Sequence, residues 1–71
     1  MEKFDKVLTE VGLNPKSATK FLEEIFTAGQ NSKSGDEAFI ELLKNKGIVS
    51  PNGKDFYNGL FYKIYKKSQE L

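Results

Sequence analysis

Residues 56–65 read FYNGLFYKIY and indicate the fold most clearly. Their apolar side chains recur at every fourth position in two adjacent rows, which are Phe56, Leu60 and Ile64, and Tyr57, Phe61 and Tyr65. This spacing is typical of a helix with a wide apolar face, because side chains four residues apart lie on the same side of a helix. The period-2 alternation of a strand is absent. We therefore expect a helix here, with its aromatic row largely buried.

Two further amphipathic helices are expected in the N-terminal half. Apolar residues at positions 4, 7, 8 and 11 predict a helix over residues 3–11 that Gly12 closes. The dipeptide Asn14-Pro15 is a typical helix start, since Asn caps free backbone N–H groups and Pro needs no N–H at the first position. The apolar stripe that follows predicts a second helix over about residues 15–28. Gly29 is expected just after its end.

A polar, turn-prone loop at residues 30–35 leads to the third expected helix. Ser34 and Glu37 have the spacing of a capping box, in which two side chains satisfy free N–H groups at a helix start. Lysines in the last turn and Gly47 just beyond it mark the end of this helix. Its buried stripe is expected to be Ala38, Phe39, Leu42 and Leu43.

The predicted architecture is a single all-α domain over residues 1–71, a small four-helix domain with a helix-turn-helix-like C-terminal half. The turns are expected at residues 12–14, 29–35 and 47–55, where Gly, Pro, Asn and Ser gather. The first two helices are expected to pack as a hairpin across the last two. A chain of 71 residues leaves no room for a second domain.

The composition excludes most catalytic chemistry. The chain has no Cys and no His, so it lacks a thiolate, a disulfide, an imidazole base and the usual zinc ligands. The acidic pair Glu37 and Glu41 is interpreted as helix-start and solubility residues rather than as a metal site. We expect a non-enzymatic protein without a cofactor. Because the first residues contain no long apolar run, we also expect a cytoplasmic protein without a membrane span.

Charge is unevenly distributed along the chain. Residues 1–43 carry five Lys against eight acidic residues, a net charge of −3, whereas residues 44–67 carry six Lys against one Asp, a net charge of +5. A basic C-terminal third is typical of a surface for nucleic acid or for an acidic partner, although a solvated Lys-rich helix end has the same composition. All the basic residues are Lys, so the forked guanidinium that reads guanine is absent.

The passage from the third helix to the fourth contains the most specific local pattern. Residues 42–56 read LLKNKGIVSPNGKDF, and Phe61, Ile64 and Tyr65 follow at helical spacing. This pattern resembles the DNA-binding part of large serine recombinases and related mobile-element proteins, over about residues 42–66. The resemblance implies a helix-turn-helix-like unit whose second helix meets DNA. It also implies that Gly47 ends one helix and that Phe56 anchors the next.

The face that the fourth helix leaves for a partner is the predicted binding site. Lys63, Lys66, Lys67 and Lys54 are expected to contact phosphates, Asn58 to address a base edge, and Gly59 to permit close backbone approach. Tyr62 is expected to be the exposed contact residue, because helical spacing turns it away from the buried aromatic row. The predicted site residues are Lys54, Asn58, Gly59, Tyr62, Lys63, Lys66 and Lys67.

Two functions fit this sequence. The first is a DNA-binding or regulatory module of phage or mobile-element type, for which a homodimer would double the basic surface. The second is a protein-interaction domain, such as an accessory factor or inhibitor, that uses the aromatic face and the acidic N-terminal half. Lysines that converge around Tyr62 favour the first function, whereas lysines scattered among acidic residues favour the second. The same apolar residues also suit a helix pair that is packed for stability alone.

Overall fold

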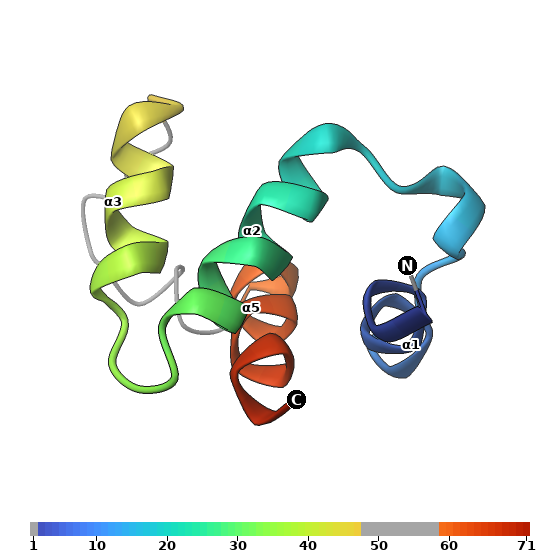
Figure 1. Cartoon of the computed structure of the whole chain (residues 1–71). Coiled ribbons are helices and arrows are strands. Elements are labelled where there is room, and N and C mark those ends of the chain that lie inside the picture. Colours follow the sequence, from blue (N-terminus) through green and yellow to red (C-terminus); the bar gives the residue numbers. More distant parts are fainter. Residues whose placement is uncertain (1, 48–58) are drawn as a thin grey trace.

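The computed structural model describes residues 2–47 and 59–71 and is all-α, as the sequence predicts. Its helices are α1 (Glu2–Glu10), α2 (Lys20–Asn31), α3 (Glu37–Asn45) and α5 (Leu60–Glu70), with a short 3-10 helix, η1 (Pro15–Ser17) (Figure 1). The turn predicted at residues 47–55, apart from Gly47 itself, lies outside the described residues. Phe56 and Tyr57 also lie outside them.

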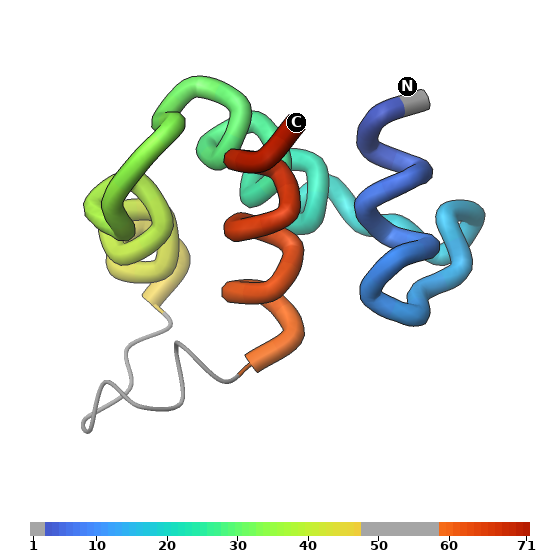
Figure 2. Tube along the Cα trace, turned by 90° about the horizontal axis from the view of Figure 1, so that it is seen from below, coloured from blue at the N-terminus to red at the C-terminus, as the bar shows by residue number. Residues whose placement is uncertain are grey.

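Helix α5 lies at the centre of the helix arrangement. Figure 2 shows it between α3 and α1, and its most extensive contact is with α2. Helix α1 also packs against α5. The predicted hairpin of the first two helices is wrong, because α1 is seen end-on in Figure 1 while α2 runs across the view. The segment between them, with η1 in its middle, redirects the chain.

The predicted helix over residues 15–28 is split in two. The Asn14 side chain caps as predicted, accepting a hydrogen bond from the Lys16 N–H at 3.0 Å, but it caps only η1. Ala18 and Thr19 then adopt extended backbone conformations, and α2 begins at Lys20. Thr19 is its N-cap, since its Oγ1 accepts a hydrogen bond from the Leu22 N–H at 3.4 Å.

Gly29 does not end α2. The helix continues to Asn31, and Gly29 is buried within it at the crossing with α5. A Cβ at this position would lie 2.5 Å from the Ser68 Cβ and 2.7 Å from the Tyr65 carbonyl oxygen, so only glycine fits. The prediction that Gly29 ends the helix is therefore wrong, because its role is to let two helices approach closely.

The start of α3 also differs from the prediction. The N-cap is Asp36, without a side-chain capping hydrogen bond, so the capping box predicted from Ser34 and Glu37 is wrong. Gly35, with φ of +78°, turns the chain just before the helix. At the other end, Gly47 has φ of +74° and follows the last turn, as predicted.

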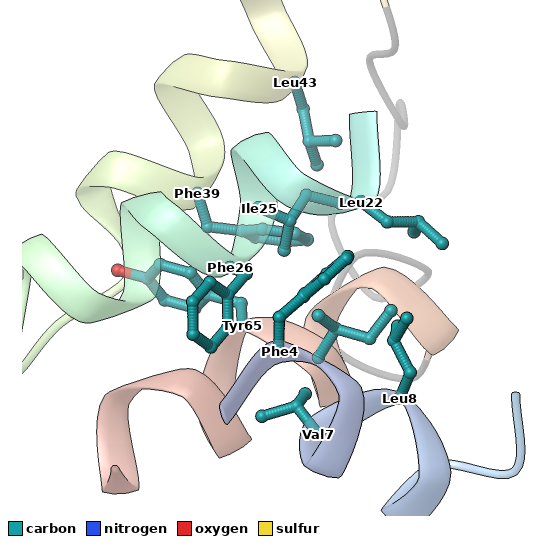
Figure 3. Packing of buried hydrophobic residues seen from close by; sticks show 10 residues of the cluster. Phe4, Val7, Leu8, Leu22, Ile25, Phe26, Phe39, Leu43 and Tyr65 are labelled. Atoms are coloured by element: carbon teal, nitrogen blue, oxygen red, sulfur yellow. The ribbon is translucent and has the colours of Figure 1, made fainter. Parts of the chain in front are cut away.

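The core joins all four described α-helices (Figure 3). The Phe39 ring of α3 lies 5.2 Å from the Tyr65 ring of α5, and the Phe4 ring of α1 lies 5.3 Å from that of Phe26 of α2. Both pairs are tilted, and such aromatic pairs add to the stabilisation from apolar burial. The buried hydrophobic residues are Phe4, Val7, Leu8, Leu22, Ile25, Phe26, Phe39, Leu43, Ile64 and Tyr65.

The apolar face predicted for the last helix is partly confirmed. Ile64 and Tyr65 are fully buried, whereas Leu60 is exposed at 39%. Leu60 is the first residue of α5. Ser68, one turn after Ile64, is fully buried where α5 meets Gly29 of α2. Its hydroxyl donates a hydrogen bond to the Ile64 carbonyl oxygen at 2.7 Å, so this buried polar group is satisfied.

Polar contacts from α5 hold the loop between α2 and α3. The Tyr65 hydroxyl donates a hydrogen bond to the Gly35 carbonyl oxygen at 2.9 Å. The Gln69 side-chain amide donates to the carbonyl oxygens of Ser32 and Gly35, each at 2.8 Å. A further hydrogen bond joins α2 directly to α5, since the Gln30 side-chain amide donates to the Ser68 carbonyl oxygen. The loop is thus positioned by long-range hydrogen bonds.

Replacing Tyr65 by Phe is expected to lower the free energy of unfolding by about 1 kcal/mol, the usual net contribution of one hydrogen bond. The ring stays in the core, and the Gly35 carbonyl keeps its bond from Gln69. Urea unfolding followed by circular dichroism measures the loss. Tyr62→Phe is the matched control and is expected to lose less, since Tyr62 is only half-buried. Equal losses in the two variants would contradict the prediction.

Candidate binding surface on α5

The structure places most of the predicted site residues on one helix. Tyr62, Lys63, Lys66 and Lys67 lie on α5. Gly59 is the N-cap of the same helix, and its carbonyl oxygen accepts the hydrogen bond of the Lys63 N–H at 3.2 Å. Lys54 and Asn58 lie outside the described residues. Four of the seven predicted residues therefore share a helix whose geometry can be analysed directly.

These four side chains line a groove of about 400 Å³ that α5 forms with the end of α1. We call it the α1–α5 groove. Its remaining lining comes from Glu10, Val11 and Glu70. Sequence reasoning missed the contribution of Glu10 and Val11, because no local signal places residues of the first helix beside the last one.

Tyr62 is not the freely exposed residue that the sequence predicts. It is half-buried, and its ring centroid lies 5.5 Å from that of Phe39 and 6.5 Å from that of Tyr65. Its hydroxyl donates a hydrogen bond to Asp36 Oδ1 at 3.2 Å. Part of the Tyr62 side chain packs against the core and part lines the groove. Tyr62 therefore contributes both to stability and to the candidate binding surface.

Acidic side chains accompany two of the three groove lysines. The Lys66 Nζ lies 3.9 Å from Asp36 Oδ1 and 5.8 Å from the Tyr62 ring centroid. The Lys67 Nζ lies 3.8 Å from Glu70 Oε2. Lys63 is exposed and has no ion pair with a described residue. Because such solvent-exposed pairs are weak, the lysines remain available to a partner that offers stronger contacts.

The α1–α5 groove is therefore a surface of mixed charge over apolar patches. Three lysines meet Glu10 and Glu70 within the lining, and Asp36 lies beside them. Val11 and the Tyr62 ring supply apolar surface between these charges. The closeness of the three lysines in the sequence predicted that they would share one surface of α5. It did not predict Asp36, which reaches α5 from the N-cap of α3.

Within residues 2–47 and 59–71, no three His, Cys, Asp or Glu side chains gather closely enough to hold a metal ion. Among the helices so described, none is long and apolar enough to span a bilayer.

Comparison with family models, with curated proteins and with solved structures found no match for this chain. The resemblance to recombinase segments over residues 42–66 accordingly stays a prediction from the sequence.

Proposed function

We propose that this protein is a non-enzymatic protein-binding module whose contact surface is the α1–α5 groove. The observation that carries the proposal is the interleaving of lysines with carboxylates around Val11 and Tyr62. An accessory factor or an inhibitor is a protein of this type.

Mixed charge over apolar surface suits a protein partner. Protein interfaces combine an apolar centre that often includes Tyr with a polar rim. The charged rim contributes to specificity and to the rate of association, since the partner must match the pattern of opposite charges. Among the described residues, Lys63 has no ion-pair partner, and Lys66 and Lys67 are only loosely paired, so the best match is a partner with an apolar centre and carboxylates around it.

DNA binding is the second candidate, in a regulatory protein of phage or mobile-element type. The observation in its favour is that Lys63, Lys66 and Lys67 converge on one groove with Tyr62. Affinity for DNA, however, depends largely on the neutralisation of phosphates by basic side chains, which acidic side chains among them oppose. Glu10, Glu70 and Asp36 would each face or approach the phosphates. The protein-binding function therefore fits the groove better.

A nuclear magnetic resonance titration of the isotopically labelled chain tests the proposal. The probes are a helical peptide of Leu and Glu at amphipathic spacing, its Leu and Lys counterpart, and a duplex DNA of about 15 base pairs, about 50 Å long at 3.4 Å per pair. We expect the Leu-Glu peptide to shift the amide signals of α5 and of Val11. The DNA is expected to cause only weak shifts that disappear as salt is raised.

A pair of variants sharpens this titration. Lys63→Gln is expected to lower the affinity for the Leu-Glu peptide about two- to fivefold, which is the effect of losing one exposed charge pair. Lys16→Gln removes the same charge from η1 and is expected to leave the affinity unchanged. If the DNA binds with submicromolar affinity, on the order of what specific complexes reach, and the peptide does not bind, DNA binding is the correct function.

A further inference from the structure

We propose that the partner bound at the α1–α5 groove and the adjoining edge of α5 is a second copy of the same chain. The protein would then self-associate head to tail. The inference rests on the proposed function and names its partner. The basic edge of α5 in one copy docks into an acidic groove between α2 and α3 of the other. The proposal depends on charge and shape features that lie on different helices of the same molecule.

The acceptor is a groove of about 510 Å³ between α2 and α3, which we call the α2–α3 groove. Ala28, Ala38 and Leu42 supply its apolar floor, and two of these side chains are small enough for a partner to approach closely. Glu37 and Glu41 line it on the α3 side, and both are exposed. Neither forms an ion pair with any residue that the structure describes. The groove thus combines an apolar floor with unpaired negative charge.

The donor is an edge of α5 that carries Leu60, Lys63 and Lys67. Positions 60, 63 and 67 share one side of a helix, being spaced by three and four residues. Leu60 is 39% exposed, and no other large hydrophobic residue is exposed in the part of the chain that the structure describes. With respect to residues 2–47 and 59–71, Lys63 has no ion-pair partner, and the Lys67 Nζ lies 3.8 Å from Glu70 Oε2. This edge therefore offers an apolar anchor flanked by two cations.

The two surfaces match in spacing and in sign. Glu37 and Glu41 are four residues apart on α3, and Lys63 and Lys67 are four residues apart on α5. Side chains at this separation lie about 5–6 Å apart, so both pairs can meet across an interface. Like charges one turn apart repel each other within each helix, and the opposite pair relieves that repulsion. Leu60 then covers the floor formed by Ala28, Ala38 and Leu42.

Sedimentation equilibrium over rising protein concentration tests self-association. We expect the average mass to rise above the 8.0 kDa of one chain, with a dissociation constant between about 10 μM and 1 mM, as small interfaces give. Added salt is expected to weaken the association, because exposed charges are screened. A chain that stays monomeric up to about 1 mM overturns the proposal. The Leu-Glu peptide still tests the α1–α5 groove in that case, so the two failures are distinguishable.

Charge reversal at each surface identifies the contact. Glu41→Lys and Lys63→Glu each are expected to weaken self-association about tenfold, because an attraction becomes a repulsion. Both changes place opposite charges one turn apart within their own helix, with Glu37 and with Lys67 respectively, so folding is retained. Lys16→Glu, on η1, has the same charge change as Lys63→Glu and is expected to leave self-association unaltered.

A mixture of the two variants is the decisive experiment. The Glu41→Lys chain keeps the basic edge and the Lys63→Glu chain keeps the acidic groove, so equal amounts are expected to recover a complex of one copy of each. Recovery in the mixture supports the head-to-tail contact. If the mixture stays as dissociated as each variant alone, or if neither variant is weakened, the proposed contact is wrong.

Discussion

Replacement of Phe39 by Ala is expected to lower the free energy of unfolding by about 3–5 kcal/mol, the usual cost of removing a buried phenylalanine ring. Phe39 is 1% exposed, and its ring contacts both Tyr65 and Tyr62. Through these two rings it links α3 to α5. A chain of 71 residues has a total stability of only about 4–10 kcal/mol, so this variant is expected to be largely unfolded or close to it.

Urea unfolding followed by far-ultraviolet circular dichroism measures this loss, with Ile40→Ala as the matched control. Ile40 is the next residue along α3 and is only half-buried, so its truncation is expected to cost much less. Phe39→Leu keeps most of the apolar volume and is expected to fall between the two variants. A loss below about 1 kcal/mol for Phe39→Ala would show that α3 does not depend on this ring.

Gly29→Ala is expected to destabilise the protein by about 2–3 kcal/mol, although alanine is the better helix former. The added Cβ would meet the Ser68 Cβ at 2.5 Å and the Tyr65 carbonyl oxygen at 2.7 Å. The second contact is with backbone, so a side-chain rotation cannot relieve it and α5 must move away from α2. The separation of these helices would also strain the Gln30 hydrogen bond to Ser68.

The same unfolding measurement distinguishes this overpacking from an effect of helix propensity. Thr27→Ala, on the exposed side of α2, is the control and is expected to change stability by at most about 0.5 kcal/mol. Ser68→Gly removes the nearest atom, so the double variant is expected to lose less than the sum of the two single losses. Stabilisation by Gly29→Ala would mean that the two helices are not in close contact at this position.

Apolar periodicity predicted the position of α1 and the buried residues near the middle of α5. Residues 3–11 were predicted as a helix and α1 covers Glu2–Glu10, and Ile64 and Tyr65 are buried as the spacing predicts. The errors lie at positions where local preference does not decide the structure. The N-cap of α2 is Thr19 and not Asn14, and the N-cap of α3 is Asp36 and not Ser34. Local sequence does not choose between these residues, because each has a side chain that can cap a helix.

The candidate site shows the same division. The lysines of α5 were predictable as a group, because residues 63, 66 and 67 share one helix and lie within two turns. Their acidic neighbours were not, since Asp36 and Glu10 come from elements far away in the sequence. The half-burial of Tyr62 was equally hidden, because it depends on where Phe39 of α3 lies.

Residues 60–65, with the sequence LFYKIY, are the part of this stretch that lies in α5, and they illustrate what the sequence by itself determined. Spacing and side-chain type determined that this segment is helical, that Ile64 and Tyr65 are buried, and that lysines share its outer side, since these properties depend on neighbours within a few residues. Only the tertiary structure decided that Leu60 is exposed, that Gly29 belongs to a helix crossing and that carboxylates lie among the lysines. The physical reason is that packing brings together residues whose separation in the chain leaves no periodic signal.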